Sequence, residues 1–175
     1  MCDVIHITTV ESPIGELTLA ARGERVCLLH FGPRDPQVNA ALGRWYPGVP
    51  PSEVVAHPDP AGAVAALRSY FEGDLGALDR IAVEMNGTPF QKKVWTALRS
   101  VRAGTTVAYA EIARAILAPS SVRAVGAANG ANPVAVIVPC HRIIGTNGTL
   151  TGYGGGLDRK RWLLDHEGVQ RSIFM

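Results

Sequence analysis

Cysteine is scarce in this sequence, and its spacing argues against a fold held by disulfides. The 175 residues contain three cysteines, Cys2, Cys27 and Cys140. Their number is odd and they lie far apart, unlike the even, closely spaced cysteines of small secreted scaffolds. No C-x-x-C pair occurs, and the group Cys2, His6, Cys27 and His30 lacks the ligand spacing of a zinc site. We therefore expect free thiols, no metal and the reducing environment of the cytoplasm.

Long apolar runs and nucleotide-binding glycine patterns are also missing. No run approaches the roughly 18–20 apolar residues of a membrane-spanning helix. The N-terminal MCDVIHITTV has the composition of neither a signal peptide nor a transit peptide. No G-x-G-x-x-G follows a predicted strand, the P-loop lysine pattern is absent, and no internal repeat or low-complexity stretch occurs. These absences favour a cytoplasmic protein without a membrane anchor or a cofactor.

What is present is an ordinary globular composition with an uneven charge distribution. Hydrophobic residues make up 47% and charged residues 18% of the chain, which argues against disorder. Residues 1–90 hold six Arg and eleven Asp or Glu (net −5), and residues 91–175 hold eleven Arg or Lys and four Asp or Glu (net +7). The basic half indicates an anionic partner such as nucleic acid. The alternative is a pair of solvated surfaces that differ in charge.

The first half has the pattern of a small α/β domain, which we place at 1–86. Three β-branched stretches separated by short turns predict an antiparallel meander: 4–10, 16–21 and 26–31. Helices are predicted at 35–48 and 63–73, with a loop at 54–62 between them and a further strand at Ile81–Met85. No catalytic cluster is evident here.

The second half, placed at 87–175, is predicted to be mainly helical. A helix is expected from the N-cap Thr88 to Gly104. Two short helices joined by a Pro/Ser turn follow, the second at 122–129 with Ser120 or Ser121 as its N-cap. Such a pair is typical of a helix-turn-helix.

A candidate reactive site follows these helices, at the end of the apolar run VAVIVPC (134–140). This run predicts a buried strand that ends at Cys140. A neighbouring His141 could lower the thiol pKa or take its proton, and Glu167 or Asp165 could orient the imidazole. The alternative is an inert buried cysteine beside a surface histidine.

Several stretches together resemble one known family. NPVAVIVPCHRIIG, with GTTVAYAEIA and SSVRAVGAANGANP before it and GYGGGLDRKRWLLDHEG after it, resembles the O6-alkylguanine-DNA alkyltransferases over Thr88–Gly168. SPIGELTLA resembles the N-terminal domain of that family more weakly. The resemblance implies a ribonuclease H-like α/β domain followed by a winged-helix-like domain with a helix-turn-helix.

The resemblance also implies the chemistry of the site. Cys140 would accept the alkyl group from O6-alkylguanine, and from O4-alkylthymine, in one irreversible displacement that consumes the protein. His141 would take the thiol proton through a water, with Glu167 preferred over Asp165 as the group that orients it. Asn132 matches the hinge asparagine that ties the helix-turn-helix to the active site.

DNA recognition is implied by the same comparison. The second helix would lie in the minor groove of double-stranded DNA, bound by a monomer, with cooperative binding left open. Arg123 matches the residue that replaces the flipped base in the stack, and Tyr109 the residue that crowds the target phosphate and hydrogen-bonds the base. The other residues expected at the DNA are small: Ser121, Ala124, Gly126, Ala127 and Gly130.

The implied guanine pocket uses the carbonyl groups of Cys140 and Ile143. Its remaining residues are Pro139, Tyr153, Gly154 and Gly155. Gly154 stands where a serine is common in the family, which predicts a wider pocket that admits bulkier alkyl groups. The zinc ligands found in some members are not reproduced, whereas Cys140 separates the chain from members that lack the cysteine.

Two other functions fit parts of this pattern. In a damage sensor or regulator, Cys140 would be a signalling site, but 175 residues leave no room for a separate regulatory domain. A cysteine hydrolase with a Cys–His–Glu triad would turn over on esters or amides, and would not need a helix-turn-helix.

Overall fold

The computed structural model describes residues 4–50 and 53–169, which divide into two compact units. The first unit runs to Asn86 and also includes Pro133–Ile137. The second contains Gly87–Asn132 and the chain from Val138 onward. The sequence analysis placed residues 87–175 in one continuous domain. In the structure, residues 133–137 belong instead to the first unit. In the described part of the chain, no helix is both long and apolar enough to cross a membrane.

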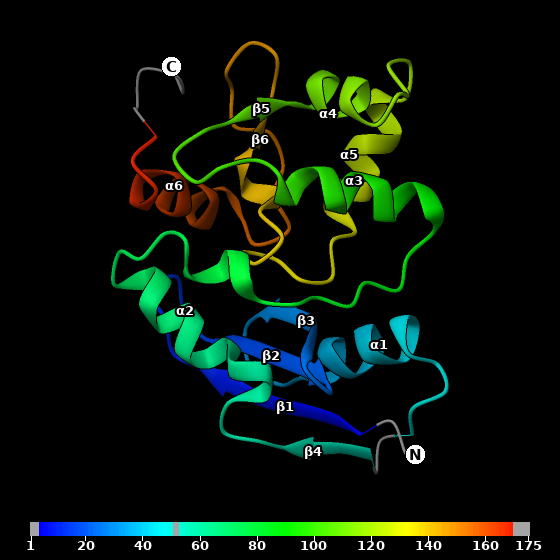
Figure 1. Ribbon diagram of the computed structural model, residues 1–175, viewed down its shortest axis with the longest axis vertical. Helices are drawn as coiled ribbons and strands as arrows, with labels where there is room; N and C mark the ends of the chain where they lie inside the picture. Colours follow the sequence, from blue (N-terminus) through cyan, green and yellow to red (C-terminus); the bar gives the residue numbers. More distant parts are fainter. Residues whose placement is uncertain (1–3, 51–52, 170–175) are drawn as a thin grey trace. The chain divides into compact units, whose positions relative to one another are not determined.

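The first unit is built on a four-stranded sheet with the order β3-β2-β1-β4 (Figure 1). Strands β1 (Ile5–Val10), β2 (Leu17–Arg22) and β3 (Arg25–Phe31) pair antiparallel in sequence order. The predicted meander is therefore confirmed. Strand β2 lies between its neighbours, and Leu17–Ala21 are all buried, so both faces of the sheet are covered.

Two predictions for this unit were wrong. The loop expected at 54–62 begins with strand β4 (Val54–Ala56), which pairs parallel with β1. The strand expected at Ile81–Met85 is reduced to a single bridge between Val26 and Val83. The described part of this unit also contains two short 3-10 turns, η2 (Pro60–Gly62) and η3 (Ala77–Arg80).

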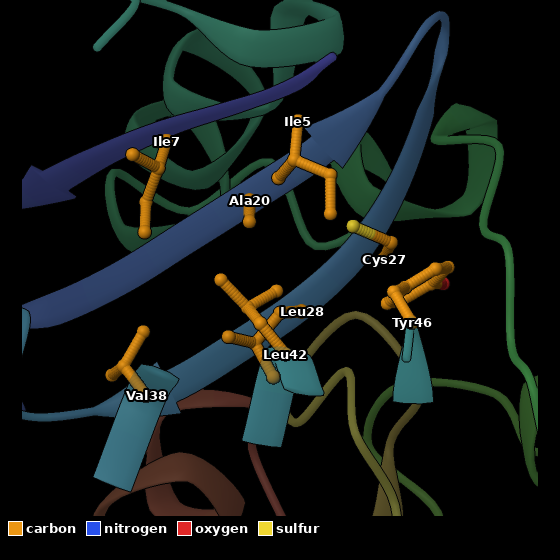
Figure 2. Packing of buried hydrophobic residues seen from close by; sticks show 8 residues of the cluster. All are labelled: Ile5, Ile7, Ala20, Cys27, Leu28, Val38, Leu42 and Tyr46. Carbon is orange, nitrogen blue, oxygen red and sulfur yellow. The ribbon is translucent and has the colours of Figure 1, made fainter. Parts of the chain in front are cut away.

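Helix α1 (Pro36–Trp45) closes the core on one face of the sheet. Its N-cap Asp35 accepts hydrogen bonds from the backbone N–H groups of Gln37 and Val38 at 2.8 and 3.0 Å. Figure 2 shows the residues that pack together: Ile5, Ile7, Ala20, Cys27, Leu28, Val38, Leu42 and Tyr46. Helix α2 (Ala63–Phe71) follows η2, which contacts β1, β2 and β3. Both helices agree with the sequence prediction.

The second unit is mainly helical, as expected. Helix α3 (Pro89–Arg99) starts with a capping box between Thr88 and Gln91, but it ends before the predicted Gly104. The later helices are α4 (Tyr109–Ala115), α5 (Val122–Gly130) and α6 (Leu157–His166). Two short parallel strands, β5 (Val107–Ala108) and β6 (Ile143–Ile144), pair with each other.

The predicted strand at 134–140 is absent, although the segment is buried as expected. Val134 forms an isolated bridge to Leu29, and the chain then turns, with the N–H of Ile137 bonded to the carbonyl of Ala135 at 2.8 Å. Val136 adopts φ +68°, which interrupts the extended backbone. Cys140 therefore begins a 3-10 turn, η4 (Cys140–Arg142), instead of ending a strand.

Candidate active site

The turn η4 places Cys140 and His141 side by side inside the second unit. It is held by the N–H of Arg142 bonded to the carbonyl of Pro139 at 3.0 Å. Cys140 is 5% exposed and His141 is fully buried, so the expected alternative of a surface histidine is wrong. Neighbours on a strand point to opposite faces, whereas successive side chains of a 3-10 turn lie about 120° apart.

Glu167 binds two basic side chains of this turn at once. Its Oε1 lies 2.9 Å from His141 Nε2 and accepts from Arg142 Nη2 at 2.8 Å, while its Oε2 accepts from Arg142 Nε at 2.9 Å. Arg142 also donates to the carbonyl of Val101. Glu167 is the C-cap of α6, so the end of that helix delivers the carboxylate. Asp165, the other acidic candidate, lies two residues earlier and is half-buried.

The electrostatics of this cluster favour an ionised Glu167 and a neutral His141. Burial alone would raise the pKa of Glu167, but hydrogen bonds from His141 and Arg142 outweigh it and hold that pKa well below its usual range. Burial lowers the pKa of His141, against the pull of Glu167. An ionised carboxylate only accepts hydrogen bonds, so Nε2 carries the imidazole proton and Nδ1 is left as an acceptor. Nδ1 has no hydrogen-bond partner among the described residues.

Cys140 itself is protonated at neutral pH. Burial raises the pKa of its thiol, and hydrogen bonds with the Asn132 and Tyr153 side chains and the charge of Lys160 offset this only in part. Asn132 also donates from Nδ2 to the carbonyl of Val138 at 2.9 Å. The thiol therefore needs a base to become a nucleophile.

Sequence reasoning did not single out three residues that lie around the turn. Asn129 on α5 points Nδ2 at the carbonyl of Cys140 at 3.5 Å, and the Thr151 hydroxyl donates to the Tyr109 hydroxyl at 3.2 Å. The third residue is Lys160, which is fully buried. Helix phase could have found it, because it lies three and four residues before the buried Leu163 and Leu164.

Helix α5 exposes a face of small side chains. Val125, Ala128 and Asn129 are buried. The exposed positions include four of the expected DNA-contacting residues: Arg123, Ala124, Ala127 and Gly130. Ser121 occupies the N-cap position, but its side chain makes no capping hydrogen bond.

Tyr109 and the remaining pocket residues lie in the same unit as this face. A Cβ added at Gly126 would lie 3.8 Å from the Tyr109 ring, so α5 packs closely on it. Pro139, Ile143 and Gly155 are buried, and Tyr153 is half-buried. Gly154 is exposed, and an added Cβ would meet nothing within 4 Å.

The first unit offers no metal centre in its described residues. Across the part of the chain that the structure covers, no group of three or more His, Cys, Asp or Glu side chains is arranged to hold an ion. Cys27 is buried in the core of Figure 2, where burial raises its thiol pKa to about 12. Cys2 lies outside the described residues.

Comparison with known proteins decides the family. Two family models match, the ribonuclease-like domain of 6-O-methylguanine DNA methyltransferase at residues 5–85 and its DNA-binding domain at residues 89–169. The methylated-DNA–protein-cysteine methyltransferase of Mycobacterium bovis is 47% identical over 167 residues, which cover 94% of this chain and 93% of that protein. This chain belongs to the 6-O-methylguanine DNA methyltransferase family. The resemblance read from the sequence is thereby confirmed.

Other members of the 6-O-methylguanine DNA methyltransferase family agree in sequence and in structure. The protein of the same name from Salmonella typhimurium is 51% identical over 116 residues, 66% of this chain and 68% of its own. The crystal structure of the Mycobacterium tuberculosis O6-methylguanine methyltransferase has a TM-score of 0.76 at 41% identity, covering 94% of this chain and 93% of that one. A structure of Mycobacterium tuberculosis OGT in complex with DNA has a TM-score of 0.75 at 40% identity, with coverages of 97% and 94%.

Proposed function

We propose that this chain repairs DNA by transferring the alkyl group of O6-alkylguanine to Cys140 in a single, irreversible step. The observation that carries the proposal is the buried arrangement of Cys140, His141 and Glu167 around η4. It supplies a protonated nucleophile, a neutral base and an ionised carboxylate that orients the base. Family membership supplies the reaction class.

In the proposed mechanism, the thiol proton passes through one water to His141 Nδ1, the acceptor that no described protein group occupies. Glu167 holds the imidazole by Nε2 and stabilises the imidazolium that forms. The Cys140 sulfur attacks the alkyl carbon as the bond between that carbon and O6 breaks. Both electrons of the broken bond stay with guanine, which takes up one proton at N1, so the proton lost by the thiol is balanced. The thioether product is stable, and each protein molecule therefore acts once.

The second part of the proposal concerns delivery of the base. Helices α4 and α5 act as a helix-turn-helix, and the small side chains on the exposed face of α5 suit a minor groove about 6 Å wide. The target base leaves the stack, and Arg123 takes its place. Tyr109 contacts the phosphate and the base, with its hydroxyl held by Thr151. Flipping costs a few kcal/mol, less for a damaged and poorly paired base.

The proposed pocket reads guanine with the carbonyl groups of Cys140 and Ile143. Each carbonyl oxygen has two lone pairs, so its bond to Asn129 or Lys160 leaves one for the base. Gly154 leaves open space beside the pocket, which we propose admits bulkier alkyl groups and O4-alkylthymine. A benzyl-to-methyl rate ratio that does not fall in Gly154→Ser would contradict this.

The test uses an oligonucleotide duplex that carries one O6-methylguanine, followed by intact and peptide mass spectrometry. We expect one added methylene per molecule, located at Cys140, and no further turnover with excess DNA. Cys140→Ser should lose transfer and keep binding to alkylated DNA. Cys27→Ser is the matched control, since Cys27 is a free, buried cysteine of the first unit, and it should transfer normally.

Other outcomes would reject the proposal. Multiple turnovers would indicate a hydrolase or a true catalyst. Methylation at Cys27 would show that η4 does not supply the nucleophile. Binding of alkylated DNA without transfer would indicate a damage sensor.

A further inference from the structure

Leu117 is an unusual residue in the turn between α4 and α5. Its side chain is 90% exposed, whereas the next most exposed large hydrophobic residue in the described part of the chain, Val55, is 46% exposed. Its backbone is left-handed, with φ +59°. The N–H of Ala118 bonds to the carbonyl of Ala113 at 2.8 Å, so Leu117 stands where a Schellman motif usually has glycine. A Cβ disfavours this conformation, so an exposed leucine here indicates a role outside the turn itself.

Leu117 stands at one end of a groove between α3 and α4, two helices that pack against each other (Figure 1). This end of the groove has a volume of about 630 Å³, and its apolar lining includes Ala97, Ala115 and Ile116. A second hollow of about 400 Å³ shares Ala97 and Ala115 with the first and continues past the buried Val101. The two hollows form one continuous groove, the kind of surface that receives a segment of another protein.

The groove has an excess of positive charge. Lys92 and Lys93 line the first hollow, where none of the lining residues is acidic, and neither lysine forms an ion pair with a described residue. Both are exposed and lie near the N-terminus of α3, whose first turn holds no acidic residue, so the helix dipole adds to their charge. The second hollow is lined by Arg102 and by Glu111, which is already engaged at the start of α4, where it accepts from the N–H of Ala108 at 2.7 Å.

We propose that this groove docks an acidic amphipathic helix of a partner protein. Apolar side chains on one face of that helix cover Leu117 and Ile116, and Asp or Glu side chains beside them pair with Lys92 and Lys93. The charge of the groove selects an acidic partner. The exposed leucine selects a protein, because DNA phosphate is bound through charges and N–H groups and makes no use of an apolar side chain. The inference is independent of the proposed alkyl transfer, since none of these residues belongs to that site.

The experiment selects peptides from a random library. Peptides of about 16 residues, or about four helical turns, are displayed on phage and selected on the wild-type protein, with Leu117→Ala protein in excess as a competitor. We expect the enriched peptides to carry several Asp or Glu residues and to have apolar residues at helical spacing. Fluorescence anisotropy with synthetic copies of these peptides gives their affinity, which should weaken as salt is added.

Two sets of variants and a matched control locate the binding. Leu117→Ala, and the double variant Lys92→Glu with Lys93→Glu, should each weaken binding of the enriched peptides by about tenfold or more. Arg25→Glu with Arg34→Glu makes the same charge change at exposed positions of the first unit and should leave the peptide affinity unchanged. Leu117→Gly should also lose binding, while its relief of strain raises the midpoint of thermal unfolding by about 2–4 °C. Leu117→Ala should transfer methyl groups at the wild-type rate.

Several outcomes would overturn the inference. These are a selection that enriches no peptide, enriched peptides without acidic residues, equal binding of the peptides by the wild type and Leu117→Ala, and a midpoint that does not rise in Leu117→Gly. If the double lysine variant and Leu117→Ala both weaken binding of an undamaged duplex by about tenfold, the groove is a DNA surface and not a protein docking site. If the wild type self-associates in sedimentation and Leu117→Ala does not, the occupant is a second copy of this chain. A wild-type protein that does not transfer alkyl groups would refute the proposed function and leave the peptide result unaffected.

Discussion

At the scale of single residues, the carboxylate of Glu167 combines a proposed role in alkyl transfer with a role in stability. It is fully buried and binds both His141 and Arg142. Removing one member of a buried charged network leaves the others without compensation. The residue proposed to orient the base is therefore also one that we expect to stabilise the second unit.

Glu167→Gln should lower the free energy of unfolding by about 3 kcal/mol at pH 7, because Arg142 stays buried without its counter-charge. Transfer should slow by about 100-fold, since His141 loses the group that fixes its tautomer. Urea unfolding and single-turnover transfer measure the two effects. Asp158→Asn removes a fully exposed carboxylate from the same helix and should change neither.

The difference in unfolding free energy between the wild type and Glu167→Gln depends on pH. The pKa of Glu167 is lower in the folded than in the unfolded protein. Its contribution is complete above the unfolded value of about 4.3 and is lost as the pH falls below it. The stability gap between the wild type and Glu167→Gln should narrow from about pH 4 downward. A gap that stays constant in this range would show that Glu167 is not held ionised.

At the scale of elements, the end of α6 lies close against the turn that follows α3. Gly104 has φ +78°, and a Cβ added there would lie 3.0 Å from the backbone carbonyl oxygen of Glu167. Gly168 has a similar φ of +80°, but an added Cβ would meet nothing within 4 Å. Substituting each glycine in turn therefore distinguishes the cost of backbone strain, which both share, from the cost of a close contact, which only Gly104 has.

Gly168→Ala should lower the free energy of unfolding by about 1 kcal/mol through left-handed strain alone. Gly104→Ala should cost about twice as much and should also slow transfer, because the added methyl group displaces Glu167. Thermal unfolding and single-turnover rates on both variants test this. Equal losses with normal transfer in both would mean that the contact relaxes without moving the carboxylate.

Which elements the sequence could predict depended on how local their causes are. The helices α1 and α3 start at Asp35 and Thr88, whose side chains cap the backbone within three residues. Strand β4 was missed because its three residues are stabilised by pairing with β1, far away in the chain. The 134–140 run has the composition of a strand, and composition does not reveal the positive φ of Val136.

The site was predictable to a similar extent. Cys140 and His141 stood out as neighbours, whereas the choice of Glu167 over Asp165 came from the family resemblance alone. Arg142 donates two hydrogen bonds to Glu167, which lies 25 residues further along the chain, and no local pattern encodes this contact. The same holds for Lys160 and its two carbonyl partners.

At the scale of the whole molecule, the net charge of +7 in residues 91–175 favours binding to DNA phosphates. Phosphate contacts weaken with salt and affect all targets alike, whereas a residue that fills the stack acts on flipping.

Arg123→Ala should therefore slow transfer from a well-paired O6-methylguanine more than from a mismatched one, since the mismatch flips at lower cost. Arg114→Ala removes an exposed charge from α4 and should not slow transfer from one duplex more than from the other. Single-turnover rates on the two duplexes over a range of salt concentrations measure this. If Arg123→Ala slows both duplexes equally and reduces the salt slope by about one, Arg123 is a phosphate contact only.

The return of Pro133–Ile137 to the first unit has a consequence for how the protein is made. The N–H of Leu29 bonds to the carbonyl of Pro133 at 2.9 Å, and Val134 forms a bridge beside it. During synthesis, the first unit thus lacks one of its segments until about fifty more residues have left the ribosome, by which time α3, α4 and α5 have already been translated. The segment that completes the first unit is followed within three residues by Cys140, so the nucleophile emerges just as that unit becomes complete.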